Sequence, residues 1–393
     1  MPSEGGDASL GETDRDPRVY RVARSRDALD EKGKVMSQKY KVIQWATGVV
    51  GSSALRSTVR HPKLELVGLK VYNDEKVGRD AGDIVGIDKT GVIATQDVEE
   101  IIALDADCVL YCPMPWSTEE ICRLLESGKH VITPCPYWFP FLQNSQAAES
   151  IKVACKEGNV NFHASGCNPG GIAERFPLTF SGWCNRIDRI TMTECGECTY
   201  YSSERVMREL MNLGKTPEQA LRNPIKMMLQ KSWNEPIDMI AEGLGTEVIS
   251  YEAEHGFILA AEPIETAVGI IEPGTIALNH YRHIGKTRAG TEIIQEQIWF
   301  VGDSRQEKLE KKMDIPRESG WRIKIEGDVN LNIDIDFPPE LSQDQRVAQG
   351  LSTTAFHLVN AVPLVCEAAN PGLKTYLDLP MITGCMGTHA TDR

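Results

Sequence analysis

Apolar residues alternate between strand-like and helix-like spacing from Lys39 to Ala164. Short apolar runs that suit buried strands occur at residues 42–46, 64–72, 91–95, 107–112, 130–133 and 159–164. The clearest helix between them is residues 117–127. Ser117 is its expected N-cap, Glu120 follows three residues later, and Gly128 comes after its end. Strands separated by helices of this length predict an α/β fold with a parallel, doubly wound sheet.

The spacing changes after Gly166. Residues 187–193 alternate like a half-buried strand, and residues 204–213 and 225–240 are expected to be helical. Strand-like runs then follow one another at residues 266–271, 275–284, 291–301, 320–326 and 328–337. Strands grouped in this way predict an antiparallel sheet in an α+β domain. Residues 343–368 are expected to form one helix, which Asn370-Pro371-Gly372 ends.

A glycine turn lies between the first strand and the helix that follows it. The dinucleotide pattern GxGxxG takes the form Ala46-x-Gly48-x-x-Gly51 here, with alanine in place of the first glycine. Glycine lets the backbone approach a pyrophosphate closely, and the helix N-terminus offers free N–H groups. We expect the cofactor to bind the whole turn, namely Ala46, Thr47, Gly48, Val49, Val50 and Gly51. A purely structural strand–helix turn is the alternative.

Further cofactor contacts are expected where other strands of the parallel sheet end. Ligands of such sheets bind at the carboxyl ends of the strands, which selects the loops at residues 46–51, 72–79, 112–116 and 133–140. Asn168, in the motif GCNPGG, follows the last strand and belongs to the same edge. From these loops we predict cofactor contacts for Asn73, Cys112, Pro113 and Asn168.

The loop after the second strand bears on the choice of nucleotide. Val71 occupies the position where an aspartate for the adenosine ribose is commonest. The neutral residue, with Lys70, Lys76 and Arg79 nearby, admits a 2′-phosphate and favours NADP. Asp74 lies in the same loop and keeps NAD open.

Charge and composition exclude several classes of partner. The 393 residues carry a formal net charge of -14, whereas nucleic acids and anionic membranes attract basic surfaces. We find no apolar run of transmembrane length and no apolar signal-peptide core. Eleven cysteines without framework spacing suit reduced thiols in the cytoplasm. Cys195 and Cys198 form a CxxC, but without a second pair we predict no metal site.

Five motifs together resemble one family. They are WATGVVGS, LELVGLKVYNDEKVGRDAGDIVG, GCNPGG, ERVMRELMNLGKTPEQA and LVNAVPLVCEAANPGLKTYLDLP, and they lie within residues 39–384. The first is common to many dinucleotide-binding proteins, whereas the other four together are far more specific. On these motifs the chain resembles the dihydrodipicolinate-reductase-like oxidoreductases. Within them it resembles the group of 2,4-diaminopentanoate dehydrogenases and native amine dehydrogenases.

The resemblance implies a domain organisation and an activity. After a disordered tail at residues 1–37, it implies a Rossmann-like domain at residues 38–165 and a substrate-binding, dimerising α+β domain at residues 166–340. Residues 341–393 would return to the first domain. The protein would be a homodimer that transfers hydride between a nicotinamide and a C–N or similar carbon centre. Gly48 and Gly51 would hold the pyrophosphate, and Asn168 would lie near the nicotinamide.

One loop departs from the pattern of the amine dehydrogenases. Those proteins carry two glutamates before an aromatic–proline pair, whereas Cys135 and Pro136 stand at those positions here, if Pro140 is the right anchor. Neither residue can replace a carboxylate. The loop offers an aromatic wall instead, with Tyr137 as a candidate proton donor and Trp138 and Phe139 as substrate contacts. Simple packing of the loop is the alternative.

Other candidate substrate residues lie in the second domain. Glu197 is a candidate replacement carboxylate. Tyr201 and Arg208 are candidate substrate contacts, although a tyrosine can also simply pack and an arginine at a helix surface can be paired or solvated. His280 and His283 lie on opposite faces of a strand, so at most one faces a pocket, and His280 is the candidate.

These features lead to two hypotheses. The first is an NAD(P)-dependent oxidoreductase that acts on a C=N or C=O bond of a small, rather apolar molecule. The second is a cofactor-binding sensor or interaction protein with weakened catalysis, which the missing loop glutamates favour. A closed pocket at the nicotinamide, with a titratable residue within reach, would distinguish the enzyme from the sensor.

Overall fold

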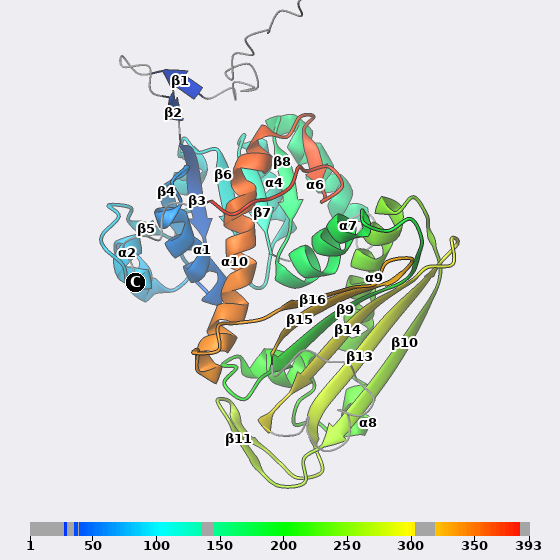
Figure 1. Cartoon of the computed structure of the whole chain (residues 1–393). Helices are drawn as coiled ribbons and strands as arrows, with labels where there is room; N and C mark the ends of the chain where they lie inside the picture. Colours follow the sequence, from blue (N-terminus) through cyan, green and yellow to red (C-terminus); the bar gives the residue numbers. More distant parts are fainter. Residues whose placement is uncertain (1–26, 30–34, 38, 135–144, 303–318, 386–393) are drawn as a thin grey trace, which may run out of the picture. The chain divides into compact units, whose positions relative to one another are not determined.

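The computed structural model describes residues 27–29, 35–37, 39–134, 145–302 and 319–385 (Figure 1). The chain divides into two units, Met1–Lys39 and Tyr40–Arg393. In the first unit, β1 (Asp27–Leu29) and β2 (Val35–Ser37) form an antiparallel pair. This pair lies within the predicted disordered tail at residues 1–37. The rest of that tail lies outside the described residues.

Seven parallel strands form the first sheet of this unit, in the order β17-β8-β7-β6-β3-β4-β5. Their bounds are β3 (Tyr40–Trp45), β4 (Leu64–Lys70), β5 (Ala94–Thr95), β6 (Cys108–Tyr111), β7 (His130–Thr133), β8 (Asn161–Ala164) and β17 (Gly372–Lys374). The predicted parallel sheet is confirmed. The strand order reverses at β3, and such a reversal opens a crevice for a ligand at the carboxyl end of that strand.

Helices cover both faces of the parallel sheet. On one face, α4 (Thr118–Glu126) and α6 (Ser145–Gly158) pack through Leu124 and Ile151. On the other face lie α1 (Val49–Arg60) and the long α10 (Gln343–Glu367), the orange helix beside α1 in Figure 1. Short elements complete this half: η1 (Asp74–Lys76), α2 (Ala81–Val85) and α3 (Val98–Ala103). The fold is therefore doubly wound, as predicted.

A second sheet follows, with strand order β10-β13-β14-β9-β15-β16. Its strands are β9 (Ile187–Glu197), β10 (Val248–Leu259), β13 (Ile276–Thr287), β14 (Glu292–Phe300), β15 (Gly320–Gly327) and β16 (Leu331–Ile335). The prediction of an antiparallel sheet is wrong for one pair, because β9 and β14 run parallel. The two strands are far apart in sequence. The helices that lie between them in the chain are η3 (Val206–Leu210), α8 (Pro217–Leu221) and α9 (Ile225–Gly243).

Two further differences have local causes. Strand β10 was not predicted, because it is an edge strand whose residues are mostly exposed and not patterned. The single strand predicted at residues 266–271 is instead a hairpin of β11 (Ile264–Thr266) and β12 (Gly269–Ile271). Gly269 has a φ of 101°, which only glycine adopts readily, and it lets the chain turn there.

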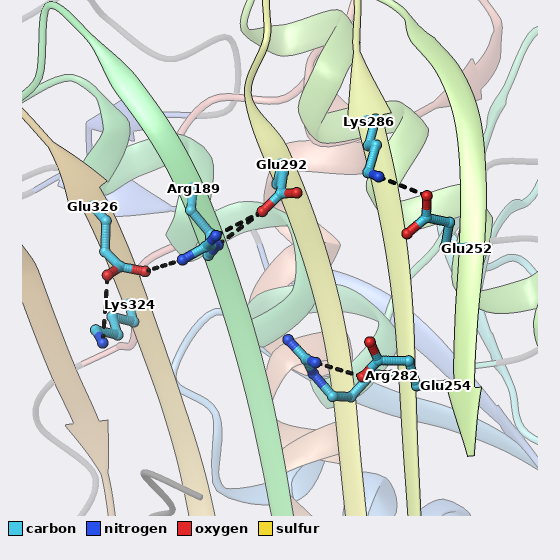
Figure 2. Close-up of polar contacts among 8 residues, drawn as sticks. All are labelled: Arg189, Glu252, Glu254, Arg282, Lys286, Glu292, Lys324 and Glu326. Carbon is cyan, nitrogen blue, oxygen red and sulfur yellow. Dashed lines mark hydrogen bonds and ion pairs between the residues drawn. The ribbon is translucent and has the colours of Figure 1, made fainter. Parts of the chain in front are cut away.

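The two faces of the second sheet differ in character. Helix α9 packs its Ile237 and Ile240 on one face, against Ile190 and Met192 of β9. The opposite face carries a set of ion pairs, of which all but the last lie between neighbouring strands (Figure 2). They join Arg189 to Glu292 at 2.8 Å and to Glu326 at 3.5 Å, Lys286 to Glu252 at 2.6 Å, Arg282 to Glu254 at 2.5 Å and Lys324 to Glu326 at 3.6 Å. Because side chains alternate along a strand, Glu194 shares the face of Ile190 and Met192.

Candidate active site

The glycine turn after β3 has the geometry of a phosphate cradle. Gly48 is the N-cap of α1, with no side-chain cap and no acidic residue in the first turn, so the helix N–H groups are open to an anion. A Cβ on Gly51 would lie 2.3 Å from the carbonyl oxygen of Ala46, so only glycine fits there. Ala46 itself has a φ of 74°, in the left-handed region that favours glycine. The structure thus explains why glycine is commonest at that position.

Replacing Ala46 with glycine should relieve this strain. The left-handed conformation costs an L-residue roughly 1–2 kcal/mol, and glycine loses about 0.5–1 kcal/mol of that gain through chain entropy. We therefore expect Ala46→Gly to raise the free energy of unfolding by up to about 1.5 kcal/mol. Urea titration measures the change. A destabilised variant would mean that packing of the buried Ala46 methyl outweighs the strain.

A cavity of about 930 Å³ starts at this turn and follows the carboxyl edge of the parallel sheet. Most of the predicted cofactor contacts line it: Ala46, Thr47, Gly48, Val49, Val50, Asn73, Cys112, Pro113 and Asn168. Gly51 is buried behind the turn and does not line the cavity. Sequence reasoning missed several other lining residues, among them Ser117 and Glu120. The cavity lies at the carboxyl ends of the parallel strands, which is where sheets of this type bind dinucleotides.

Of the three cations expected near the ribose, Lys76 lines the cavity. Its ammonium donates to the carbonyl oxygen and to Oγ1 of Thr47, at 3.1 and 2.9 Å. Lys70 is buried instead, with Nζ 3.1 Å from the centroid of the Tyr72 ring, and burial lowers its pKa. Arg79 donates to the carbonyl oxygen of Asp83 at 3.3 Å.

The carboxylate that could contact a ribose is turned away. Asp74 Oδ1 accepts a hydrogen bond from Gln96 Nε2 at 2.8 Å, and Asp74 is not among the residues that line the cavity. Val71, which directly follows β4, is buried. At this end of the cavity, Lys76 and not Asp74 is therefore among the lining residues.

A second cavity of about 270 Å³ adjoins the first at the edge of the second sheet. The two share Cys167, Asn168, Tyr201, Val206, Leu351 and Thr354 as lining residues. The second cavity has mainly apolar walls, which include Trp299, Trp321, Phe337, Leu210, Met211 and Val347. Glu194 and Glu197 of β9 add two carboxylates to this apolar lining. The arrangement suits a small molecule placed beside the end of a dinucleotide.

Glu194 is held by three uncharged donors. Trp299 Nε1 donates to its Oε1 at 2.9 Å, and Trp321 Nε1 donates to its Oε2 at 3.0 Å. Asn168 Nδ2 also donates to Oε2, at 2.9 Å, while Asn168 Oδ1 accepts from Gln295 Nε2 at 2.7 Å. Sequence reasoning missed Glu194, although a signal was present. A glutamate at the same parity as Ile190 and Met192 is a charge on the inward face of a strand.

The remaining candidates fall in different places. Glu197 Oε1 accepts from the backbone N–H of Thr199 at 3.0 Å, and its buried Oε2 has no hydrogen-bond partner among the described residues. Tyr201 lines both cavities. Tyr137, Trp138 and Phe139 lie outside the described residues.

Arg208 and His280 do not line either cavity. Arg208 donates to the carbonyl oxygen of Ile270 at 3.3 Å. His280 lies on the charged face of the second sheet, where its Nε2 is 2.9 Å from Glu296 Oε1. Side chains alternate along a strand, so only one of His280 and His283 can face a given side of the sheet. His280 lies on the charged face and lines neither cavity, so the structure does not support its predicted substrate contact.

Buried titratable groups lie around Tyr376. His163 and His357 both contact the ring of Tyr376, with ring centroids 5.4 and 5.7 Å away. Burial lowers the pKa of each histidine to about 4. Burial, with Glu235 nearby, raises the pKa of Glu174 well above its usual range. In the described part of the chain, no group of three His, Cys, Asp or Glu residues is arranged to hold a metal ion.

Comparisons with known proteins give the chain its relatives. The profile of the 2,4-diaminopentanoate dehydrogenase C-terminal domain matches residues 171–392. An amine dehydrogenase of Streptomyces virginiae is 28% identical over 358 residues, which cover 86% of this chain and 96% of that protein. The structure of an amine dehydrogenase from Mycobacterium smegmatis matches with a TM-score of 0.70 and 18% identity, covering 88% of this chain and 97% of that one.

A probable dehydrogenase from Thermotoga maritima shares the fold more distantly, with a TM-score of 0.51 and 12% identity over 86% of this chain and 92% of that one. No helix in the described residues is long and apolar enough to cross a membrane. The family profile covers more than half of the chain, and the resemblance found in the sequence is confirmed. The chain therefore belongs to the 2,4-diaminopentanoate dehydrogenase family and is an oxidoreductase.

Proposed function

We propose that this oxidoreductase transfers hydride between NADP or NAD and a C=N or C=O carbon of a small, rather apolar molecule. One observation carries the proposal: the cavity at the glycine turn adjoins an aromatic-walled cavity, and Asn168 lines both. A dinucleotide lying along the first cavity would bring its nicotinamide to Asn168 and its reacting carbon to the mouth of the second. Relatives that are amine dehydrogenases support the same chemistry.

Named residues would hold each part of the cofactor. The N–H groups at the start of α1, after Gly48, would bind the pyrophosphate, and Asn73 and Lys76 would lie beside the adenosine ribose. Cys112 and Pro113 would line the middle of the cavity. When bound, the nicotinamide supplies the hydride chemistry, while the protein supplies orientation and a proton-handling group.

The substrate would occupy the second cavity. Its aromatic and aliphatic walls suit an apolar body, and Tyr201 and Glu197 are within the lining. Tyr137, Trp138 and Phe139 stay predictions for the same site. We further propose that residues 38–165 form the cofactor domain, residues 166–340 the substrate and dimerisation domain, and residues 341–393 the return to the first domain.

Cofactor binding and turnover test the proposal directly. Titration of protein fluorescence with NADH and NADPH is expected to give saturable binding of at least one of them. Turnover is then followed on a panel of ketones, with and without ammonia. Binding without oxidation of either cofactor across the panel would reject the enzyme and favour the sensor hypothesis.

We propose that Lys76 gives a preference for NADP. Its ammonium lies at the cavity wall, where the usual ribose-binding aspartate is replaced by Val71. Loss of a charge-assisted hydrogen bond costs about 1.5–3 kcal/mol, so Lys76→Ala should weaken NADPH binding by about 10-fold to 100-fold. The dissociation constant of NADH should change by less than about 3-fold.

Lys89→Ala is the matched control for this prediction. Lys89 is an exposed lysine of the same domain that does not line the cavity. The control variant should bind both cofactors as the natural chain does. Equal weakening of NADH and NADPH by Lys76→Ala would mean that Lys76 supports the Thr47 turn and does not contact a 2′-phosphate.

A further inference from the structure

We propose that the first cavity selects the adenine base of the cofactor: Glu120 accepts a hydrogen bond from the exocyclic amino group of the base, and the Tyr72 ring packs against its face. Glu120 is thus a specificity-determining residue that takes no part in hydride transfer. The inference rests on the proposed function, because it requires a dinucleotide in this cavity. Four observations support it: the position of the two residues, the hydrogen bonds that orient Glu120, its second oxygen and the exposed ring of Tyr72.

The order of the strands identifies the end of the cavity that would receive the adenosine. Asn168, beside the expected nicotinamide, follows β8, and the glycine turn follows β3. Tyr72 follows β4, which lies on the other side of β3 from β8. The Tyr72 hydroxyl donates to Oε2 of Glu120 at 3.2 Å, so the two residues lie together. A dinucleotide whose pyrophosphate lies at the glycine turn would therefore extend its base towards Tyr72 and Glu120.

Two phenol hydroxyl groups hold the Glu120 carboxylate. The hydroxyl of Tyr111 donates to Oε2 at 2.6 Å, beside the hydroxyl of Tyr72. Each hydroxyl also accepts a hydrogen bond, Tyr72 from Nε1 of Trp45 at 3.0 Å and Tyr111 from the backbone N–H of Ser117 at 2.9 Å. A phenol has a single proton to donate, and both phenols direct it to Glu120. The orientation of the carboxylate is therefore fixed before a ligand binds.

The second oxygen of this carboxylate is available to a ligand. In the part of the chain that the structure describes, Oε1 of Glu120 accepts no hydrogen bond, and Glu120 lines the cavity. A carboxylate attracts an N–H or O–H donor and repels a carbonyl oxygen. Adenine has an amino group on its pyrimidine ring, where hypoxanthine has a carbonyl oxygen. Glu120 therefore favours adenine.

The Tyr72 ring provides a surface for the face of the base. The buried ammonium of Lys70 lies 3.1 Å from the centroid of this ring and covers one of its faces. Tyr72 is nevertheless 51% exposed and lines the cavity, as does Trp116 in the loop after β6. Bases stack on aromatic side chains. Because the Tyr72 hydroxyl contacts Glu120, a purine on this ring would have an edge beside the carboxylate.

Lys76 and Glu120 would contact different parts of the adenosine. The Lys76 ammonium donates to Thr47 in the glycine turn, whereas Glu120 is bonded to Tyr72 and Tyr111. The lysine therefore belongs to the phosphate side of the adenosine, and the glutamate belongs to the side of the base. A preference for NADP through Lys76 and a preference for adenine through Glu120 are compatible.

Cofactor analogues with a changed base provide the first test. The full chain is titrated calorimetrically with NAD⁺ and NADP⁺, and with the hypoxanthine and ethenoadenine forms of whichever binds more tightly. The hypoxanthine form has a carbonyl oxygen in place of the amino group, and the ethenoadenine form has no N–H on this edge. Both analogues are expected to bind at least about 10-fold more weakly than the adenine form. An affinity of either analogue within about 2-fold of the adenine form would overturn the inference.

Glu120→Gln provides the second test. The amide has one oxygen, which the two phenols would occupy, so its NH₂ group would be directed to the base. The variant should bind the adenine and hypoxanthine forms within about 3-fold of each other or prefer hypoxanthine. Glu119→Gln is the matched control, because Glu119 is an exposed residue in the same turn of α4 that does not line the cavity. An unchanged preference for adenine in folded Glu120→Gln would overturn the role of Glu120.

Tyr72→Leu tests the stacking of the base. Loss of the ring should weaken the adenine form by about 5-fold to 100-fold, because each base that stacks on an aromatic side chain gains energy from its face. The hypoxanthine form should weaken by a similar factor, since both purines have the same face. An unchanged affinity for both forms would show that the base does not stack on Tyr72.

The outcomes separate this inference from the proposed function. If the chain binds neither NAD⁺ nor NADP⁺, the proposed function fails. If it binds one of them and does not distinguish that cofactor from its hypoxanthine form, the function stands and this inference falls. If Glu120→Gln weakens NAD⁺ alone and keeps the preference for adenine, Glu120 binds a ribose hydroxyl, which also overturns the inference. Where Glu120→Gln has a lowered Tm, Glu120→Ala serves as the second variant and should likewise remove the preference.

Discussion

Replacing Gly51 with valine is expected to weaken binding of NADH and NADPH by at least about 100-fold. A Cβ at this position would lie 2.3 Å from the carbonyl oxygen of Ala46, and 3.0 Å from its carbonyl carbon. Both are backbone atoms of the turn itself, so no side chain can move to make room. The turn has to open, which displaces the N–H groups of α1 from the pyrophosphate. Fluorescence titration with both cofactors measures the loss.

Gly182→Val is the control for this prediction. Gly182 has a φ of -61° at the end of α7 (Phe176–Ser181), and an added Cβ would have its nearest contact at 3.6 Å. The control should bind both cofactors normally. Circular dichroism should show that Gly51→Val still folds. Unchanged affinity in a folded Gly51→Val chain would place the phosphate site elsewhere.

The second large effect is expected in acid, where two buried histidines should destabilise the fold. The pKa of His163 and that of His357 are both lowered from 6.5 to about 4 by burial. Between pH 6.5 and 4 the unfolded chain therefore binds protons that the folded chain does not. Stability is complete above pH 6.5 and is lost as the pH falls towards 4, by about 3 kcal/mol for each histidine.

Urea unfolding between pH 7.5 and 4 tests this expectation. His357→Leu removes one titrating group. Nε2 of His357 has no hydrogen-bond partner among the described residues, so the change breaks no hydrogen bond of that atom to them. Across this pH range, the free energy of unfolding of the variant should fall by about 3 kcal/mol less than that of the natural chain. An unchanged pH profile would mean that His357 is reached by water and titrates normally when folded.

Much of the fold could be predicted, because apolar periodicity reports which face of an element is buried. The six predicted strands of the parallel sheet and the helix at residues 343–368 match their observed positions closely. The strand β17 could not be predicted in this way, because Gly372-Leu373-Lys374 is too short to show a period. The parallel pairing of β9 with β14 was equally hidden, since pairing depends on how distant segments return.

The candidate site was predicted unevenly, for a physical reason. The glycine turn is a local structure, so residues 46–51 could be identified from their own spacing. The substrate end depends on contacts between β9, β14 and β15, which no local pattern specifies. Glu194 was therefore missed, while Arg208 and His280 were selected for their chemistry alone and lie outside the cavity. The homodimer and the cytoplasmic location stay predictions.

Helix α10 contributes both to the cavity walls and to the core of the parallel sheet. Its first half lines the cavities with Val347, Gly350, Leu351 and Thr354, and its second half packs Leu358, Val359 and Val362 into the core of the parallel sheet. One continuous helix thus connects the walls of the two cavities to the parallel sheet. Each residue added to a helix advances it by about 1.5 Å and turns it by about 100°. The spacing between these two sets of residues therefore fixes where the cavity walls lie relative to the core of the parallel sheet.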